Sequence, residues 1–187
     1  MLINKAAKFA IDAHGKQVRK YTGLPYVTHC AEVAMYAEAF YYDLQVKGHS
    51  LPKETLVAAA WLHDVLEDTD VTANQIFAEF GSVVGNIVVD LTDVYTAEAF
   101  PKLNRDARKA TEALRLGSIS PFSQYVKGCD MLSNTPDILK NDPNFAKVYL
   151  REKAEAIYMM DIPSRDLEYE LFSYIPNRYL DEAGFDL

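Results

Sequence analysis

The sequence predicts an all-α protein, and two observations lead to this class. Apolar residues recur at three- and four-residue intervals through most of the chain, as they do along one face of a helix. The alternating pattern of β-strands is hard to find in any segment. With 187 residues, 49% of them hydrophobic, the chain is long enough for one sizeable core and leaves little room for a second. We therefore expect a single domain over residues 1–187.

Glycine and proline separate the helices expected in the first third of the chain. The first helix carries an apolar stripe and ends at Gly15. The second starts at Thr28, a residue suited to cap a helix, and runs to about Leu44. The third runs from Pro52 through Leu62 and is apolar nearly all round, so we expect it to be buried in the domain centre.

The rest of the chain also shows helical spacing. Thr72 is suited to cap a helix through Phe80, and Gly81 separates it from a further helix that ends near Leu91. Aromatic residues near the C-terminus are expected to pack the last helices, and an exposed subset would mark an interface in a homo-oligomer. The remaining helices are expected over residues 102–116, 120–134, 143–160 and 164 to about 183.

Composition excludes several classes of protein. The formal net charge of −8 argues against a general nucleic-acid binder, which needs a basic excess to neutralise phosphates. The sequence has no apolar run of a length that spans a membrane, and its first residues lack the apolar core of a signal peptide, so we expect a cytoplasmic protein without a membrane partner. Cys30 and Cys129 are too few for a disulfide framework and are expected to be small buried residues.

Four ionisable residues lie at the end of the apolar third helix. Burying such groups without partners is costly, so their presence there needs a reason. Adjacent helical residues project about 100° apart, which lets His63 and Asp64 present an imidazole and a carboxylate to one metal ion. Glu67 and Asp68 follow four residues later on the same face, close enough to act on water or substrate beside the metal.

Two protein ligands rarely suffice for a catalytic metal, so others must come from elsewhere in the chain. His29 and Asp130 are the best candidates, because each lies in a largely apolar stretch. Two His and two Asp suit a divalent cation with open positions, and Mn²⁺ is our leading choice among several divalent metals. On spacing alone, His63-Asp64 is equally compatible with a hydrogen-bonded pair at a helix end, and His29 with an ordinary half-buried histidine.

Three blocks of sequence, taken in order, resemble a known family. The ligand set has the order and spacing of the HD phosphohydrolase superfamily, and the blocks at residues 9–29, 61–69 (WLHDVLEDT) and 126–135 (VKGCDMLSNT) resemble the hydrolase domain of RelA/SpoT homologues. The likeness spans roughly residues 5–160 and leaves the helices of 161–187 outside it. Because a synthetase domain would not fit in this chain, it is similar to the small alarmone hydrolases rather than to the long bifunctional enzymes.

This resemblance implies a fold, a reaction and roles for individual residues. The fold would be an HD-domain helical bundle. The reaction would be metal-dependent hydrolysis of the 3′-pyrophosphate of (p)ppGpp, the stringent-response nucleotides, to GDP or GTP and pyrophosphate. Glu67 and Asp68 would be the catalytic pair, one of them deprotonating the attacking water. The substrate would be bound by Arg19, Lys20, Thr22, Lys127 and Asn134.

Some positions depart from the family pattern and leave alternatives open. Cys30 stands where Pro is usual, and Ser133 where His or Asp is common, which bears on nucleotide preference. The first alternative is an HD phosphohydrolase acting on NADPH, a deoxynucleotide or a cyclic nucleotide. The second is a non-catalytic nucleotide sensor, against which the complete set of ligands and acids argues. His14 and His49 are expected to be structural or surface residues, and Arg105 is a further candidate for a positive pocket.

Overall fold

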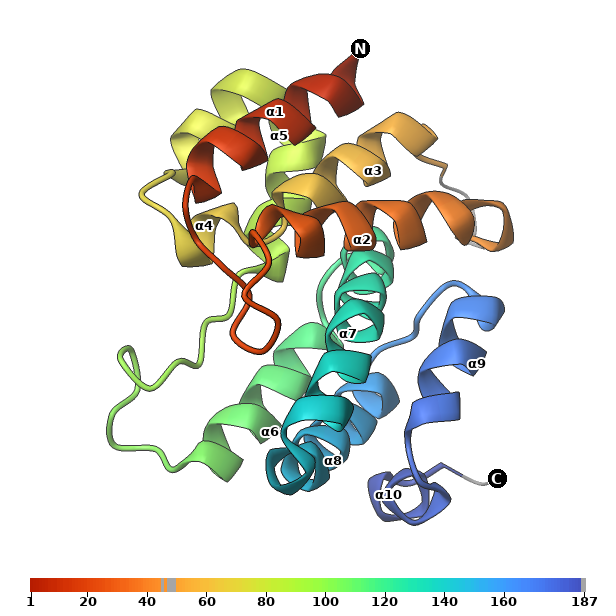
Figure 1. Cartoon of the computed structure of the whole chain (residues 1–187). Coiled ribbons are helices and arrows are strands. Elements are labelled where there is room, and N and C mark those ends of the chain that lie inside the picture. Colours follow the sequence, from red (N-terminus) through yellow and green to blue (C-terminus); the bar gives the residue numbers. More distant parts are fainter. Residues whose placement is uncertain (45, 47–49, 186–187) are drawn as a thin grey trace.

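The computed structural model is all-α, as predicted (Figure 1). It describes residues 1–44, 46 and 50–185, so the expected surface residue His49 lies outside the described part. Among these residues the β pairing is an isolated bridge between Val18 and Pro25. The helices are α1 (Leu2–His14), α2 (Val27–Ala39), the 3-10 turn η1 (Tyr41–Asp43), α3 (Lys53–Leu62), α4 (Val65–Asp68), α5 (Ala73–Leu91), α6 (Arg105–Leu116), α7 (Pro121–Asn141), α8 (Pro143–Met159), α9 (Arg165–Tyr174) and α10 (Asn177–Ala183).

Helix α3 lies at the centre of the first half of the fold, as its apolar sequence predicts. It packs against α1, α2, α5 and α7. Leu56 and Leu62 are completely buried, and the three alanines between them leave room for the neighbouring helices to approach closely. Because α3 ends at Leu62 inside the fold, the next residues of the chain are delivered to a buried position.

Helix α7 is the second central element and connects the two halves of the molecule. In Figure 1 it runs from the group of α1 to α5 toward α6 and α8, and it contacts α2, α3, α5, α8 and α9. Its residues from Ser123 to Ser133 are all buried, including the charged side chains of Lys127 and Asp130. Charged groups in such a helix need partners within the protein.

Local signals at the start of α5 and in its middle behave as predicted. Thr72 caps α5, and its side chain forms a reciprocal capping box with Gln75. Gly81 interrupts the helical backbone with φ 79° and ψ 174°, although the helix continues to Leu91. At the end of α1, Gly15 has φ 52° and closes that helix. Cys30 and Cys129 are buried free thiols, as expected.

Helix α2 differs from its prediction at both ends. It starts at Val27, and the predicted capping role of Thr28 is wrong, because the Thr28 hydroxyl donates to the carbonyl oxygen of Pro25 at 2.8 Å. It ends at Ala39, and a 3-10 turn takes the place of the last predicted turn of helix.

Two further helices have boundaries that the sequence did not indicate. Helix α6 begins three residues later than expected, because the Asn104 side chain caps it by accepting from the amide of Ala107 at 2.8 Å. Helix α7 continues beyond Asn134 and past Pro136, where Ile138 still packs into the core.

The last predicted helix is split in two. Helix α9 ends at Tyr174 and α10 begins at Asn177, because Pro176 lacks the amide hydrogen that a continuous helix needs. Of the aromatic residues here, Tyr179 is buried in the core and Tyr169 is 74% exposed. None of the helices in the described part of the chain is long and apolar enough to cross a membrane.

The backbone at Gly81 generates a stability prediction. A Cβ atom added at Gly81 would meet no atom within 4 Å, so the substitution Gly81→Ala tests backbone conformation alone. Because this φ and ψ combination is essentially restricted to glycine, we expect Gly81→Ala to lower the free energy of unfolding by about 1–3 kcal/mol in urea denaturation. Ser82→Ala, at the exposed neighbouring position, is the control and should change little. Equal stability of Gly81→Ala and wild type would show that α5 does not need this kink.

Candidate active site

His63 and Asp64 occupy the junction between α3 and α4. The Nδ1 of His63 lies 2.7 Å from the carbonyl oxygen of Ala60, one turn earlier in α3. Since a carbonyl only accepts, Nδ1 carries the hydrogen and the lone pair of Nε2 faces away from the helix. That Nε2 lies 3.0 Å from Oδ2 of Asp64. The end of α3 therefore orients the first two predicted ligands toward one point.

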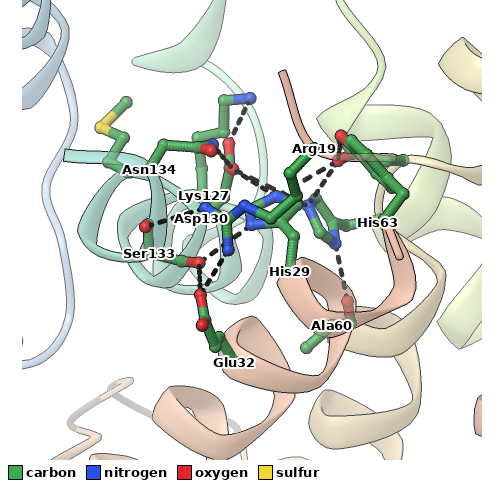
Figure 2. Close-up of polar contacts among 12 residues, drawn as sticks. Arg19, His29, Glu32, Ala60, His63, Lys127, Asp130, Ser133 and Asn134 are labelled. Atoms are coloured by element: carbon green, nitrogen blue, oxygen red, sulfur yellow. Dashed lines mark hydrogen bonds and ion pairs between the residues drawn. The ribbon is translucent and has the colours of Figure 1, made fainter. Parts of the chain in front are cut away.

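The other two predicted ligands reach the same point from α2 and α7 (Figure 2). The Nε2 of His29 lies 3.1 Å from Nε2 of His63 and 3.3 Å from Oδ2 of Asp64. Asp130 contributes Oδ1, which lies 3.3 Å from Nε2 of His29 and 3.7 Å from Nε2 of His63. The structure thus brings His29, His63, Asp64 and Asp130 together, although the sequence separates them by up to 101 positions.

The chemistry of these donors fits a divalent cation. Ligand atoms of His29, His63 and Asp64 all lie within 4.8 Å of one another. Both histidines use Nδ1 elsewhere, so two nitrogen lone pairs and two carboxylates converge on a buried space and need a positive charge between them. Burial alone lowers the pKa of His63, yet Asp64 and Asp130 raise it to about 10. This negative potential would equally favour a metal ion.

Tyr26 is part of the site, and our reasoning from the sequence did not single it out. Its hydroxyl donates to Oδ2 of Asp64 at 2.6 Å. Its ring lies between those of His14 and His29, with centroid distances of 4.8 and 5.5 Å. Burial, followed by the charge of Asp64, raises the pKa of Tyr26, so the hydroxyl stays a donor. The signal in the sequence was the place of Tyr26 in the block at residues 9–29, three residues before His29.

Glu67 and Asp68 lie at the surface beside the candidate ligands, and each carboxylate accepts a hydrogen bond from a different partner. Oε1 of Glu67 accepts from the backbone amide of Asp93 at 2.6 Å. Oδ2 of Asp68 accepts from the side-chain amide of Gln17 at 2.9 Å, and Gln17 in turn contacts His14. Desolvation by the surrounding protein raises the pKa of Glu67 to about 7, against the opposing charge of Lys127. A carboxyl group with this pKa is suited to exchange a proton near neutral pH.

A surface pocket opens beside His29, and three of the five predicted substrate residues line it. Its lining includes Arg19, Lys20 and Asn134. Arg19 and Lys20 reach it from the loop after α1, which is closed by the hydrogen bond from the amide of Arg19 to the carbonyl of Leu24 at 2.8 Å. The complete lining is Arg19, Lys20, Tyr21, Tyr26, His29, Asn134, Asp137 and Ile138.

The other two predicted substrate residues, Thr22 and Lys127, and the further candidate Arg105 do not line this pocket. Thr22 is exposed and is not part of the pocket lining. Lys127 is buried, with Nζ 3.0 Å from Oδ2 of Asp130, so it lies against a metal-ligand candidate. The Arg105 guanidinium is paired with Glu152 at 2.6 Å and does not line the pocket.

Lys127 was predicted from the sequence, but two lysines that lie near it, Lys109 and Lys153, were missed. Lys109 lies 2.9 Å from Oδ2 of Asp93, the residue whose amide holds Glu67. Burial, together with the charges of Lys127 and Lys109, lowers the pKa of Lys153 to about 8. These three lysines come from α6, α7 and α8 and form no motif, so only the fold reveals that they act on one another.

A helical fold that gathers a histidine, a His-Asp pair and a distant aspartate at one buried point defines a protein of the HD-domain class. The HD-domain family model matches residues 6–158. The chain belongs to this family, and within it to the group of the guanosine-3′,5′-bis(diphosphate) 3′-pyrophosphohydrolase MESH1.

Individual relatives support this assignment. The human MESH1 enzyme is 31% identical over 175 residues, covering 89% of each chain. The mouse enzyme is 34% identical over 142 residues, or 74% of this chain and 70% of the mouse protein. A solved structure, from work describing a metazoan SpoT orthologue that hydrolyses ppGpp, has the same fold, with a TM-score of 0.75 at 23% identity over 98% of this chain and 96% of the other.

The geometry of the cluster leads to a prediction about metal binding. We expect the wild-type chain to bind one divalent cation that a chelator removes, and His63→Ala to weaken binding by more than about 100-fold, because it deletes a candidate ligand. His14→Ala is the matched control, since His14 is buried nearby but lies outside the cluster. Isothermal titration with Mn²⁺ gives both affinities. Equal weakening by the two substitutions would contradict the proposed ligand set.

Proposed function

We propose that this protein hydrolyses the 3′-pyrophosphate of guanosine tetra- and pentaphosphate, leaving GDP or GTP and releasing pyrophosphate. The observation that carries the proposal is the convergence of His29, His63, Asp64 and Asp130 next to Glu67. The names of the human and mouse relatives, both guanosine-3′,5′-bis(diphosphate) 3′-pyrophosphohydrolases, supply the substrate.

We further propose Mn²⁺ as the metal, held by the four clustered residues. Mixed nitrogen and carboxylate donors suit this ion, although they also admit other divalent cations. When bound, the cation would neutralise charge on a phosphoryl oxygen and lower the pKa of a water molecule. In the proposed reaction a water oxygen bonds to the phosphorus attached to the ribose 3′ oxygen. The bond from that phosphorus to the 3′ oxygen then breaks, and the 3′ oxygen gains a proton.

Glu67 is the proposed general base of this reaction. Its Oε1 is held by the Asp93 amide, which leaves Oε2 to accept a proton from the attacking water. A pKa of about 7 means that the carboxylate form is available near neutral pH and still binds a proton strongly enough to remove one from water. Asp68 follows Glu67 in α4, accepts a hydrogen bond from Gln17, and would assist Glu67.

Two groups of cations would bind the substrate in spite of the net charge of −8. We propose that the pocket with Arg19, Lys20 and Asn134 takes part of the nucleotide, because it opens directly beside His29. Lys127, together with the other lysines near Asp93, would attract the pyrophosphate, since these cations lie near the candidate base. The exposed position of Thr22 gives it no comparable support.

A substrate screen tests the proposed function. The purified protein loaded with Mn²⁺ is assayed against guanosine tetraphosphate, NADPH, deoxynucleotides and cyclic nucleotides, with and without chelator. We expect pyrophosphate release from guanosine tetraphosphate with the highest kcat/KM, and loss of the activity in chelator that added Mn²⁺ restores. Preferential turnover of NADPH or another nucleotide would replace the proposed substrate. Binding without turnover would identify a nucleotide sensor instead.

The role of Glu67 predicts a specific kinetic defect. Removing a general base costs about 10²- to 10⁴-fold in rate, so Glu67→Gln should lower kcat by that amount while Mn²⁺ affinity is retained. Glu54→Gln, at the exposed start of α3, is the matched control and should behave as wild type.

The same role predicts how the rate depends on pH. The base is active when deprotonated, so the rate should fall as the pH decreases through its pKa. Burial raises the pKa of Glu67 to about 7, and a bound cation would lower it from that value. We therefore expect an acidic limb at or below pH 7 in the wild type, and its absence from the residual activity of Glu67→Gln. An unchanged limb in that variant would assign the titration to another group.

A further inference from the structure

The hydroxyl of Ser133 connects the candidate ligand His29 to a carboxylate outside the metal cluster (Figure 2). The Ser133 oxygen lies 2.9 Å from Nδ1 of His29 and 2.7 Å from Oε2 of Glu32. His29 and Ser133 are buried, whereas the Glu32 side chain is 46% exposed. A partly exposed residue of α2 therefore contacts the candidate metal site through one buried hydroxyl.

The chemistry of the three groups fixes the direction of these hydrogen bonds. A carboxylate has no hydrogen to donate, so the Ser133 hydroxyl donates to Glu32. The Ser133 oxygen is then left to accept, and Nδ1 of His29 must be the donor. With the hydrogen on Nδ1, the Nε2 lone pair of His29 faces His63, Asp64 and Asp130. This is the form of the imidazole that binds a metal through Nε2.

Arg19 fixes the Glu32 end of this chain of hydrogen bonds. Its Nη1 lies 2.7 Å from the same Oε2 of Glu32 that accepts from Ser133. Its Nη2 lies 3.1 Å from Oδ2 of Asp137 and 3.4 Å from the carbonyl oxygen of Ser133. Because the guanidinium is buried and makes all of these contacts, it has one well-defined position. The carboxylate of Glu32 is thereby held toward Ser133 despite its exposure.

The two histidines of the cluster are held by different kinds of hydrogen-bond partner. His63 donates to the backbone carbonyl of Ala60, a partner that no substitution removes. His29 depends on the side chains of Ser133 and Glu32. The orientation of one candidate ligand is thus set by the backbone, and that of the other by two replaceable side chains.

We propose that Glu32 is a positioning residue that acts through Ser133 to orient His29 toward the bound cation. The inference rests on the metal site proposed above and is independent of the nucleotide substrate. It predicts that Mn²⁺ affinity depends on a residue that is not among the ligands, and that this dependence disappears when Ser133 loses its hydroxyl.

A double-mutant cycle on Mn²⁺ affinity tests the proposal. Isothermal titration is carried out on the full chain as wild type, Ser133→Ala, Glu32→Ala and the double variant. Removing a partner that orients a metal-bound histidine costs about 10- to 100-fold in affinity, and we expect this loss in each single variant. The double variant should bind no more weakly than Ser133→Ala. Ser133→Thr keeps the hydroxyl and should retain most of the wild-type Mn²⁺ affinity.

Matched controls separate positioning from charge and from folding. Glu38→Ala removes another exposed carboxylate of α2, one that is paired with Lys53, and should leave Mn²⁺ affinity unchanged. A purely electrostatic effect of Glu32 would persist in the Ser133→Ala background, which would overturn the proposal. Thermal unfolding of the metal-free variants reports on folding. Because Glu32 is partly exposed, Glu32→Ala is expected to fold, and it can be combined with Ser133→Thr in place of Ser133→Ala when the latter fails to fold; undiminished affinity in Glu32→Ala would then overturn the proposal.

The outcomes also distinguish this inference from the function on which it rests. A wild-type chain that binds no divalent cation would overturn the metal site and the inference together. Normal Mn²⁺ binding by wild type with undiminished affinity in both single variants would overturn the positioning role alone. Non-additive losses with near-wild-type affinity in Glu38→Ala would support it.

Discussion

The burial of two imidazoles and two carboxylates at one point is the constraint on which the rest of this structure depends. The four groups come from three parts of the chain, namely α2, the junction after α3, and α7, so these elements must pack at fixed positions for the cluster to form. Groups of this kind are costly to bury unless each has a partner. The partners outside the cluster are the carbonyl of Ala60 and the side chains of Ser133, Tyr26, Lys127 and Asn134.

The sequence revealed those parts of the molecule that local chemistry determines. The helical class follows from periodicity, and the Thr72 cap and the Gly81 break follow from residues that affect their own backbone. The four candidate ligands were identifiable because His63 and Asp64 are adjacent at the end of an apolar helix and ordered blocks surround the others. The error at Thr28 occurred because its hydroxyl makes a competing local hydrogen bond to Pro25. The error around Pro176 occurred because proline lacks the amide hydrogen that would continue the helix.

What the sequence could not reveal depends on contacts between distant segments. Glu32 and Ser133 are 101 positions apart, and neither belongs to a pattern that predicts their hydrogen bond. The same holds for Lys153, whose pKa is lowered by burial and by lysines on two other helices. An acidic composition excludes a broad phosphate-binding surface but says nothing of a small cationic region. Local charge is a property of the folded arrangement, which is why a chain that is acidic overall can still gather Lys109, Lys127 and Lys153 around Asp93.

The two ways of holding a histidine have different consequences for how the site tolerates change. The bond from His63 to a backbone carbonyl survives any substitution that preserves α3, so that ligand is as robust as the helix itself. The bond from His29 to Ser133 is robust only while Glu32 and Arg19 keep their positions. Arg19 also lines the pocket beside His29, so it touches both the proposed nucleotide site and the support of a candidate ligand. A ligand bound in that pocket that drew Arg19 away from Glu32 would therefore act on His29 from both sides, directly at the pocket wall and through Ser133.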